Sequence, residues 1–308
     1  MSRYIAVDIG GTHLRAALFP EQGTQPVRIK RILTRGQGTP IDRLINLIAS
    51  IWPEEGEVKA IGMTAPGPLN PKTGVLYRAP NIPGWVDLPL RQEIENRFHV
   101  PVSLGNDGNL AALGEWRFGA GRGHHNLIYM TISTGIGGGV ICEDRLLQGH
   151  SGLAAELGHV TVLPGGPVCG CGKRGHLEAV ASGTAIARFV QEELSRGTRS
   201  SLKLDPPPTA QDIAEAARGG DPLATAAFQR AGEFIGQALA DFLHIFNPSL
   251  IILGGGVSLS GDLLIKPADA AMRRSVIAPE YLNDLSITTA ALGDDAGLLG
   301  ALALVRLL

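Results

Sequence analysis

The chain has 308 residues, of which 44% are hydrophobic and 18% are charged, and its formal net charge is −2. This length allows two lobes, because single hydrophobic cores stop growing at roughly 250–300 residues. The near-neutral charge excludes the basic surface typical of nucleic-acid binding, so no nucleic-acid partner is expected. No apolar run approaches the roughly 20 residues of a membrane span, no signal-peptide pattern precedes the first strand, and three cysteines do not indicate a disulfide framework. We therefore expect a cytoplasmic protein without a membrane partner.

The first third of the chain alternates predicted strands and helices. A buried strand at 4–8 meets a glycine turn at 9–12, and a second strand covers 14–19. A helix is expected near 40–51, with Pro40 in its first turn, and a strand at 58–64. The stretch 65–89 is rich in Pro and Gly and predicts a structured loop. A helix at 88–98, a short strand at 101–104 and a helix from Asn106 to about Phe118 follow.

The second part of the chain repeats the opening plan. A strand at 127–133, a glycine turn at 134–139 and a strand at 140–142 resemble the arrangement at 4–19, which predicts two related α/β lobes. A Gly- and Cys-rich knuckle covers 164–178, and helices are expected over 179–196 and 209–247. A third strand–glycine unit lies at 249–256, followed by a strand at 285–289 and an apolar helix from about residue 295.

Three glycine turns are candidates for binding the phosphates of a nucleotide. Glycines in a tight turn leave backbone N–H groups available to phosphate oxygens, and an aspartate at a strand end can hold Mg²⁺ through water. Each turn taken alone fits an ordinary hairpin or strand-to-helix turn nearly as well. The residues predicted to bind ATP or its phosphates are Asp8, Gly10, Gly11, Thr12, Thr134, Gly135, Gly137, Gly138, Gly254, Gly255 and Gly256.

Asn106 and Asp107 follow a predicted strand and have two interpretations. Phosphoryl transfer to an alcohol needs a carboxylate that accepts the hydroxyl proton, and Asp107 can serve as this base while the Asn106 amide binds a sugar hydroxyl. The same pair is also a good helix cap, and in isolation capping is the stronger interpretation.

The knuckle carries the most specific pattern. His159, Cys169, Cys171 and His176 are close enough in sequence to form a tetrahedral Cys₂His₂ zinc site. Such a structural Zn²⁺ fixes the loop that carries Glu156 and Glu178. The alternative is a solvated loop that happens to contain Cys and His.

Taken in order, these motifs resemble those of the ROK family of repressors and sugar kinases, and most closely its bacterial glucokinase branch. The resemblance runs from Ile5 to Gly300 and rests on six motifs: Asp8-x-Gly-Gly-Thr12, Asn106-Asp107, Thr134 to Gly139, Glu156-x-x-His159, Cys169-x-Cys171-Gly and Leu253 to Gly256. It implies the two-lobed actin–hexokinase (ribonuclease H-like) fold, in which sugar and ATP meet in an interlobe cleft. We expect a small α/β domain over 1–108, with the helix 295–308 packing back on it, and a large domain over 109–294 that carries the knuckle.

The resemblance also implies a reaction and its residues. It predicts ATP-dependent phosphorylation of glucose at the 6-hydroxyl with Mg²⁺, Asp107 as catalytic base, zinc on the knuckle, and a homodimer or homotetramer. The implied sugar-binding residues are Gly67, Asn81, Asn106, Asp107, Glu156, His159 and Glu178.

The chain departs from the family pattern in three places. His176 stands where relatives often have a third cysteine, and imidazole can replace thiolate on zinc. His13 replaces a common lysine after the first turn, which bears on a phosphate contact. Gly105 and Gly108 flank the Asn106-Asp107 pair where relatives usually have Glu and Ala, which concerns rigidity rather than the base.

Several alternatives stay open. Kinases for N-acetylglucosamine, N-acetylmannosamine or fructose share most of the same sugar motif, although loop 65–85 favours glucose. Polyphosphate or ADP needs much the same anion-binding turns as ATP. A sugar-responsive ROK regulator is disfavoured because the first strand starts at Tyr4, which leaves no preceding helix-turn-helix. An actin- or Hsp70-like ATPase has no use for the zinc-braced loop.

Overall fold

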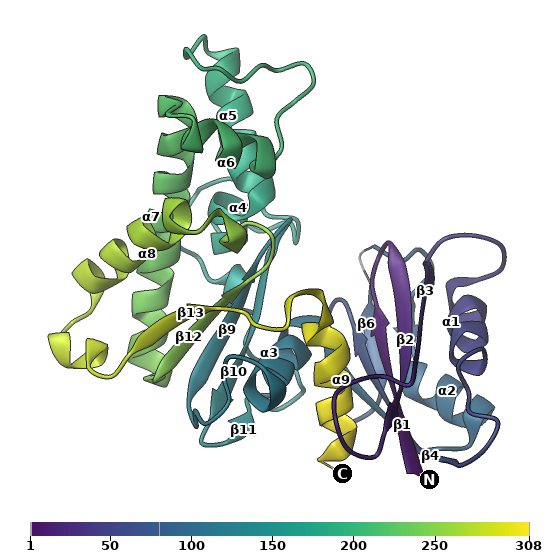
Figure 1. Cartoon of the computed structure of the whole chain (residues 1–308). Helices are drawn as coiled ribbons and strands as arrows, with labels where there is room; N and C mark the ends of the chain where they lie inside the picture. Colours follow the sequence, from purple (N-terminus) through teal and green to yellow (C-terminus); the bar gives the residue numbers. More distant parts are fainter. Residues whose placement is uncertain (1, 80, 308) are drawn as a thin grey trace. The chain divides into compact units, whose positions relative to one another are not determined.

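The computed structural model describes residues 2–79 and 81–307 (Figure 1). Met1, Pro80 and Leu308, which fall within the predicted ranges 1–108, 65–89 and 295–308, lie outside the described residues. The chain forms two compact units: residues 1–123, 139–155 and 291–308 make the first, and residues 124–138 and 156–290 make the second. The predicted domain boundary after residue 108 stays a prediction, because a division into compact units does not define functional domains.

The first unit is built on a five-stranded sheet of order β3-β2-β1-β4-β8. β1 pairs antiparallel with β2, and β2 with β3, whereas β1, β4 and β8 run parallel. The elements of this unit are β1 (Ser2–Ile9), β2 (His13–Pro20), β3 (Arg28–Leu33), α1 (Pro40–Ala49), β4 (Glu57–Ala65), β5 (Leu69–Asn70), β6 (Val75–Arg78), β7 (Val86–Leu88), α2 (Leu90–Phe98), β8 (Val102–Asn106), α3 (Asp107–Phe118), β11 (Arg145–Leu146), η4 (Gly293–Asp295) and α9 (Ala296–Arg306).

Strand alternation explains how this sheet is covered on both faces. Ile5 and Val7 of β1 face a core that includes residues of α1 and α2, whereas Ala6 belongs to a second core with residues of α3 and α9. Successive side chains of a strand point to opposite faces, so one strand contributes to two cores. The Thr39 side chain caps α1 through a reciprocal bond with Asp42, and Pro40 occupies its first turn, as predicted.

The second unit contains the larger part of a sheet with the corresponding order β11-β10-β9-β12-β13. β9, β12 and β13 run parallel, and β10 pairs antiparallel with β11. The elements are β9 (Leu127–Ile132), β10 (Ile136–Cys142, which crosses into the first unit after Gly138), η1 (Leu157–His159), α4 (Leu177–Ala181), α5 (Gly183–Ser195), α6 (Ala210–Arg218), α7 (Pro222–Phe246), β12 (Leu250–Gly254), η2 (Ser258–Ser260), α8 (Asp262–Ser275), η3 (Pro279–Leu282) and β13 (Ser286–Thr289).

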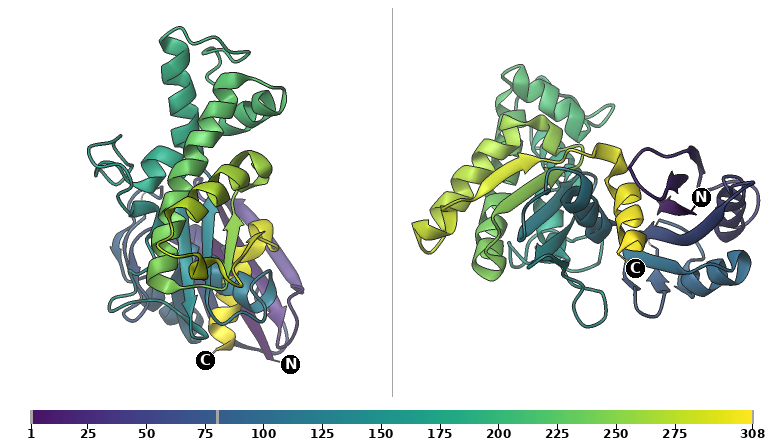
Figure 2. Two further views of the ribbon diagram at one scale, coloured as in Figure 1. Left: turned by 90° about the vertical axis from the view of Figure 1, so that its left-hand side faces the viewer. Right: turned by 60° about the horizontal axis from the view of Figure 1, so that its bottom comes forward.

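The helices of the second unit form a layer and an extension. α7 packs against α8, and α4, α5 and α6 also contact α7. Figure 2 shows α5 and α6 projecting beyond the end of the sheet in this unit, as they also do in Figure 1. Among the described residues, no helix combines the length and apolar character that a membrane crossing requires.

The structure corrects three local expectations. The stretch 65–89 is not only loop, because β5, β6 and β7 form a small antiparallel sheet within it. Strand β3 was not predicted, and the helix expected after the third glycine unit, to which no range was given, is α8. β10 starts at Ile136, so the glycine run that the sequence suggested as a turn lies largely inside a strand.

Candidate functional site

Asn106 and Asp107 lie where β8 ends and α3 begins. Asn106 is the N-cap: its Oδ1 accepts hydrogen bonds from the N–H groups of Gly108 (2.9 Å) and Asn109 (3.4 Å). Its Nδ2 donates to the carbonyl oxygen of Gly67 at 3.3 Å. Because Asn106 provides the cap, Asp107 occupies the first helical position, where the helix dipole favours a carboxylate.

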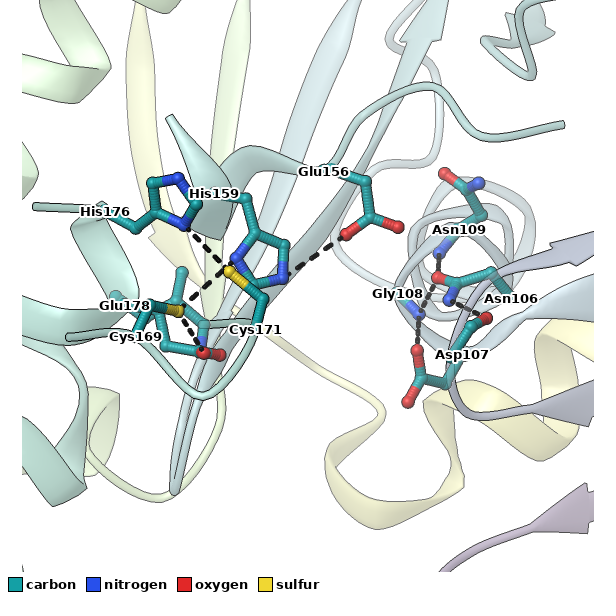
Figure 3. Close-up of polar contacts among 12 residues, drawn as sticks. Asn106, Asp107, Gly108, Asn109, Glu156, His159, Cys169, Cys171, His176 and Glu178 are labelled. Carbon is teal, nitrogen blue, oxygen red and sulfur yellow. Dashed lines mark hydrogen bonds and ion pairs between the residues drawn. The ribbon is translucent and has the colours of Figure 1, made fainter. Parts of the chain in front are cut away.

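The Asp107 carboxylate is oriented by its own helix. Its Oδ1 accepts a hydrogen bond from the Gly108 N–H at 2.8 Å, as Figure 3 shows. The capping and catalytic interpretations of this pair are therefore compatible, since the two residues divide the roles between them. The geometry suits a carboxylate that receives a proton from a bound alcohol.

The first glycine turn connects β1 to β2 and is held by Thr34, the residue that follows β3. The Thr34 hydroxyl donates to the Gly10 carbonyl oxygen at 2.6 Å, and the Thr34 N–H donates to the Thr12 carbonyl oxygen at 2.9 Å. A pocket of about 500 Å³ adjoins this turn, and it is lined by Gly11, Thr12, Leu33, Arg35 and Asn81. The structure thus brings a predicted sugar residue, Asn81, beside the predicted phosphate turn.

Asp8, the candidate Mg²⁺ residue, is paired with Arg15. Arg15 Nε and one terminal nitrogen donate to Asp8 Oδ2 at 3.0 and 2.9 Å, and the other terminal nitrogen donates to Asp295 at 3.0 Å. Burial raises the pKa of Asp8, and the neighbouring guanidinium offsets only part of that rise. Both hydrogen bonds from Arg15 reach Oδ2, so Oδ1 remains the oxygen suited to water-mediated binding of Mg²⁺.

A larger pocket of about 930 Å³ lies entirely within the second unit. Two of the predicted nucleotide residues, Thr134 and Gly256, line it. Sequence reasoning missed most of the others, which come from α5, α6, the segment before α6 and the turn after β12. The lining includes Gly183, Thr184, Gln191, Pro207, Pro208, Glu215, Arg218 and Val257. Its mixture of apolar, hydroxyl and charged groups fits a ligand with both a flat ring system and polar substituents.

The glycines near this pocket have different structural reasons. A Cβ at Gly256 would meet no atom within 4 Å, so the space beside it is open, whereas a Cβ at Gly254 would lie 2.6 Å from the Tyr129 hydroxyl. Gly138 lies inside β10, and a Cβ there would lie 2.5 Å from the Tyr129 carbonyl oxygen. Gly137 is also a strand residue, and Gly135, Gly137, Gly138, Gly254 and Gly255 are not among the residues that line the pocket. For Gly137 and Gly138 the expected position in a turn was wrong, because a strand that packs closely also requires small residues.

The knuckle brings its four candidate metal ligands together. One ligand atom from each of His159, Cys169, Cys171 and His176 lies within 4.8 Å of every other, and Figure 3 shows the side chains converging. Cys169 Sγ is 3.7 Å from His159 Nδ1, and Cys171 Sγ is 3.3 Å from His176 Nδ1. Bond lengths of about 2.0–2.3 Å give tetrahedral edges of about 3.3–3.8 Å, so this donor set and spacing fit Zn²⁺.

Glu178 connects the knuckle to the second glycine turn. Its Oε2 accepts a hydrogen bond from the Ile136 N–H at 3.0 Å, and its Oε1 accepts one from the Cys169 thiol at 3.2 Å. Burial, and to a smaller extent the Glu178 carboxylate, raise the pKa of the Cys169 thiol to about 12. A buried thiol of this kind ionises only beside a cation, which is the condition that a metal site provides.

The candidate sugar residues are divided between the two units. Gly67, Asn81, Asn106 and Asp107 belong to the first, and Glu156, His159 and Glu178 belong to the second. Within the second unit, Glu156 directly precedes η1, and its Oε2 lies 3.9 Å from His159 Nε2. His159 thus offers one ring nitrogen to the cysteine cluster and the other to the side on which Glu156 lies.

Comparison with known proteins identifies the family. The model of the ROK family matches residues 4–307. The chain belongs to the ROK family. This ROK protein is 38% identical to the glucokinase of Thermotoga maritima, over 99% of this chain and 97% of that one. It is 37% identical to the glucokinase of Streptomyces coelicolor, over 99% and 98% of the two chains.

A solved structure of a relative supports the same grouping. A ROK family glucokinase from Streptomyces griseus, in complex with glucose and AMPPNP, is 37% identical, covers 98% of each chain and has a TM-score of 0.79. This likeness confirms the predicted α/β fold of the two-lobed actin–hexokinase class.

Proposed function

We propose that this protein is an ATP-dependent glucokinase that phosphorylates the 6-hydroxyl of glucose. The observation that carries the proposal is the position of Asp107 at the first residue of α3, beside an Asn106 that caps the helix and holds the Gly67 carbonyl group. Glucose is chosen as the sugar because glucokinases of 37–38% identity match nearly the whole chain.

Asp107 is the proposed base. As the 6-oxygen of the sugar attacks the γ-phosphorus of ATP, its proton passes to the Asp107 carboxylate. The bond between the γ-phosphorus and the bridging oxygen breaks, and its electron pair leaves with ADP. Asn106 positions Asp107 by capping α3, and its amide group is proposed to bind a hydroxyl of the same sugar.

The remaining polar groups are proposed to recognise the sugar hydroxyls. The proposed set is Gly67, Asn81, Asn106, Glu156, His159 and Glu178. When Cys169 is a metal-bound thiolate it no longer donates to Glu178, so Glu178 Oε1 becomes available to a sugar hydroxyl. This exchange gives the knuckle a direct influence on sugar binding.

The two ions have separate proposed roles. His159, Cys169, Cys171 and His176 would hold a structural Zn²⁺, which stabilises the knuckle. Asp8 Oδ1 would hold Mg²⁺ through water, and the ion would offset charge on the phosphates. We expect Mg²⁺ to bind together with ATP. The protein would contribute the fixed backbone of Gly10 to Thr12, which faces the phosphates.

The nucleotide is proposed to bind in the larger pocket of the second unit. Thr134 and Gly256 line this pocket, and the apolar surfaces of Pro208 and Val257 suit an adenine ring. ATP is therefore proposed as donor over polyphosphate, which has no ring to bury. We also propose a cytoplasmic location and a homodimer or homotetramer, on the family resemblance alone.

Replacing the base tests the proposal. Asp107→Asn should lower kcat for glucose by at least about 10²-fold and leave KM for glucose within a few-fold, because the lost group acts on the reacting proton. Asp262→Asn is the matched control, since Asp262 is also a first-turn aspartate, on the exposed start of α8. A variant of Asp107 that keeps more than about a tenth of the wild-type kcat would show that another group is the base.

A further inference from the structure

Arg35 follows an anchor that holds the first glycine turn. Thr34 has no solvent exposure, and it bonds the carbonyl groups of both Gly10 and Thr12. These two bonds hold the backbone at Thr34 against the turn. The Cα atom of Arg35, the next residue, therefore has a fixed position relative to the turn. The residue next to Thr34 is therefore presented to the turn by a rigid contact rather than by a loose loop.

The turn itself offers hydrogen-bond donors to its pocket. Its carbonyl groups at Gly10 and Thr12 are occupied by Thr34, and the Gly10 N–H is bonded to the His13 carbonyl group at 2.9 Å. Within residues 2–79 and 81–307, no backbone acceptor receives the N–H groups of Gly11 and Thr12. Successive N–H groups of this kind form a concave site that favours an anion.

Arg35 differs from the other arginines near this turn. Arg15 is paired with Asp8, Arg31 with His13 at 2.9 Å, and Arg43 with the Leu33 carbonyl group. Arg35 is exposed and lines the pocket, and none of the described residues accepts a hydrogen bond from its guanidinium group. The cation next to the turn is thus available to a ligand.

Asn81, which also lines this pocket, indicates which anion the pocket would bind. A Cβ at Gly11 would lie 2.5 Å from the Cβ of Asn81, so the phosphate turn and the sugar loop are in close contact. A group bound here lies between the site proposed for the sugar and the turn proposed for phosphate. In the proposed reaction, the phosphoryl group passes between this turn and the sugar.

We propose that the Arg35 guanidinium binds oxygen atoms of the phosphoryl group as it passes from ATP to the sugar. The inference rests on the proposed kinase function. Arg35 makes or breaks no covalent bond: the bond from phosphorus to ADP breaks, the bond to the sugar 6-oxygen forms, and the hydroxyl proton goes to Asp107. A planar guanidinium group with several N–H donors suits the charge that spreads over the equatorial oxygens.

Two substitutions and a control test this assignment. Arg35→Ala should lower kcat by about 10²-fold and change KM for glucose by less than about threefold, as expected for loss of one charged donor in the transition state. Arg35→Lys should recover part of the rate, because it keeps the charge without the planar fork. Arg28→Ala, which removes an exposed charge at the far end of β3, should remain within about twofold of wild type.

A binding measurement separates this inference from the kinase proposal. Isothermal titration of the protein with pyrophosphate should show binding that weakens about tenfold in Arg35→Ala and is unchanged in Arg28→Ala. If the wild-type protein phosphorylates no sugar, the kinase proposal fails and the transfer role of Arg35 fails with it, while the titration still decides whether Arg35 binds an anion. If wild type is active and Arg35→Ala keeps its kcat within about twofold of Arg28→Ala, the assignment to the transferred group is wrong, whatever the titration shows.

Discussion

Replacing Glu115, whose carboxylate is fully buried, tests how much its hydrogen bonds stabilise the first unit. Glu115 lies near the end of α3 with no solvent exposure. Its Oε2 accepts a hydrogen bond from the Ala120 N–H and its Oε1 accepts one from the Leu292 N–H, both at 2.8 Å. One residue therefore joins the loop after α3 to the segment that precedes α9.

Glu115→Gln should destabilise the protein by about 2–3 kcal/mol. A hydrogen bond to a charged group contributes about 1.5–3 kcal/mol, and the glutamine side chain keeps only one oxygen acceptor for the two N–H donors. The second backbone N–H then faces an amide NH₂ group in a buried site, where it has no acceptor. Glu115→Ala should cost more, about 3–5 kcal/mol, because both N–H groups lose their partner.

Thermal unfolding measures this difference. For a chain of this size, about 2–3 kcal/mol corresponds to a decrease in Tm of about 3–5 °C. Glu55→Gln is the control, because Glu55 is exposed in a loop, and it should shift Tm by no more than about 1 °C. A Glu115→Gln protein with the same Tm as this control would refute the argument that the two bonds to the buried carboxylate stabilise the fold.

Three further predictions concern the second unit. Burial alone would raise the pKa of Asp221, but hydrogen bonds from the Ala224 and Ser201 N–H groups and from two serine hydroxyls outweigh it and lower the pKa to about 2. Because the folded-state pKa lies below the unfolded one, the ionised Asp221 stabilises the fold above pH about 4, and this stabilisation is lost toward pH 2. The Tm difference between wild type and Asp221→Asn should therefore shrink as the pH falls from 7 to 3. A Tm difference that stays constant over this range would contradict the argument. Cys171→Ser should reduce zinc from about one ion per chain to a small fraction by metal analysis, and full retention would remove Cys171 from the ligand set. Gly256→Val should raise KM for ATP about tenfold and leave KM for glucose unchanged, because the added side chain enters open space in the proposed nucleotide pocket. An equal rise in both KM values would contradict the assignment of Gly256 to the nucleotide site.

Local patterns predicted much of this fold. The Pro40 helix, the strand that opens the chain and the repeated strand–turn–strand plan all appear in the structure. These succeed because a helix start and a buried strand depend on neighbouring residues, which a sequence displays directly. The knuckle also followed from local spacing, since its four candidate ligands lie within 18 positions of the chain and converge in the structure.

What the sequence missed depends on contacts between distant segments. The glycines of β10 were interpreted as a turn, although Gly138 is required by the close approach of β9 and Leu157. Arg35 belongs to no motif, and its significance appears only when Thr34 and Asn81 are seen around the same turn. A lone arginine or a glutamate near a helix end carries no signal until tertiary packing gives it neighbours.

The central claim is that the protein phosphorylates glucose. The most direct test is the Mg-ATP-dependent phosphorylation rate of the purified protein with glucose, mannose, fructose, N-acetylglucosamine and N-acetylmannosamine. We expect glucose to give the highest kcat/KM, by about tenfold or more over every other sugar. A higher kcat/KM for an N-acetylated hexose or fructose would contradict the substrate assignment, and the absence of transfer to any of the five sugars would contradict the kinase assignment itself.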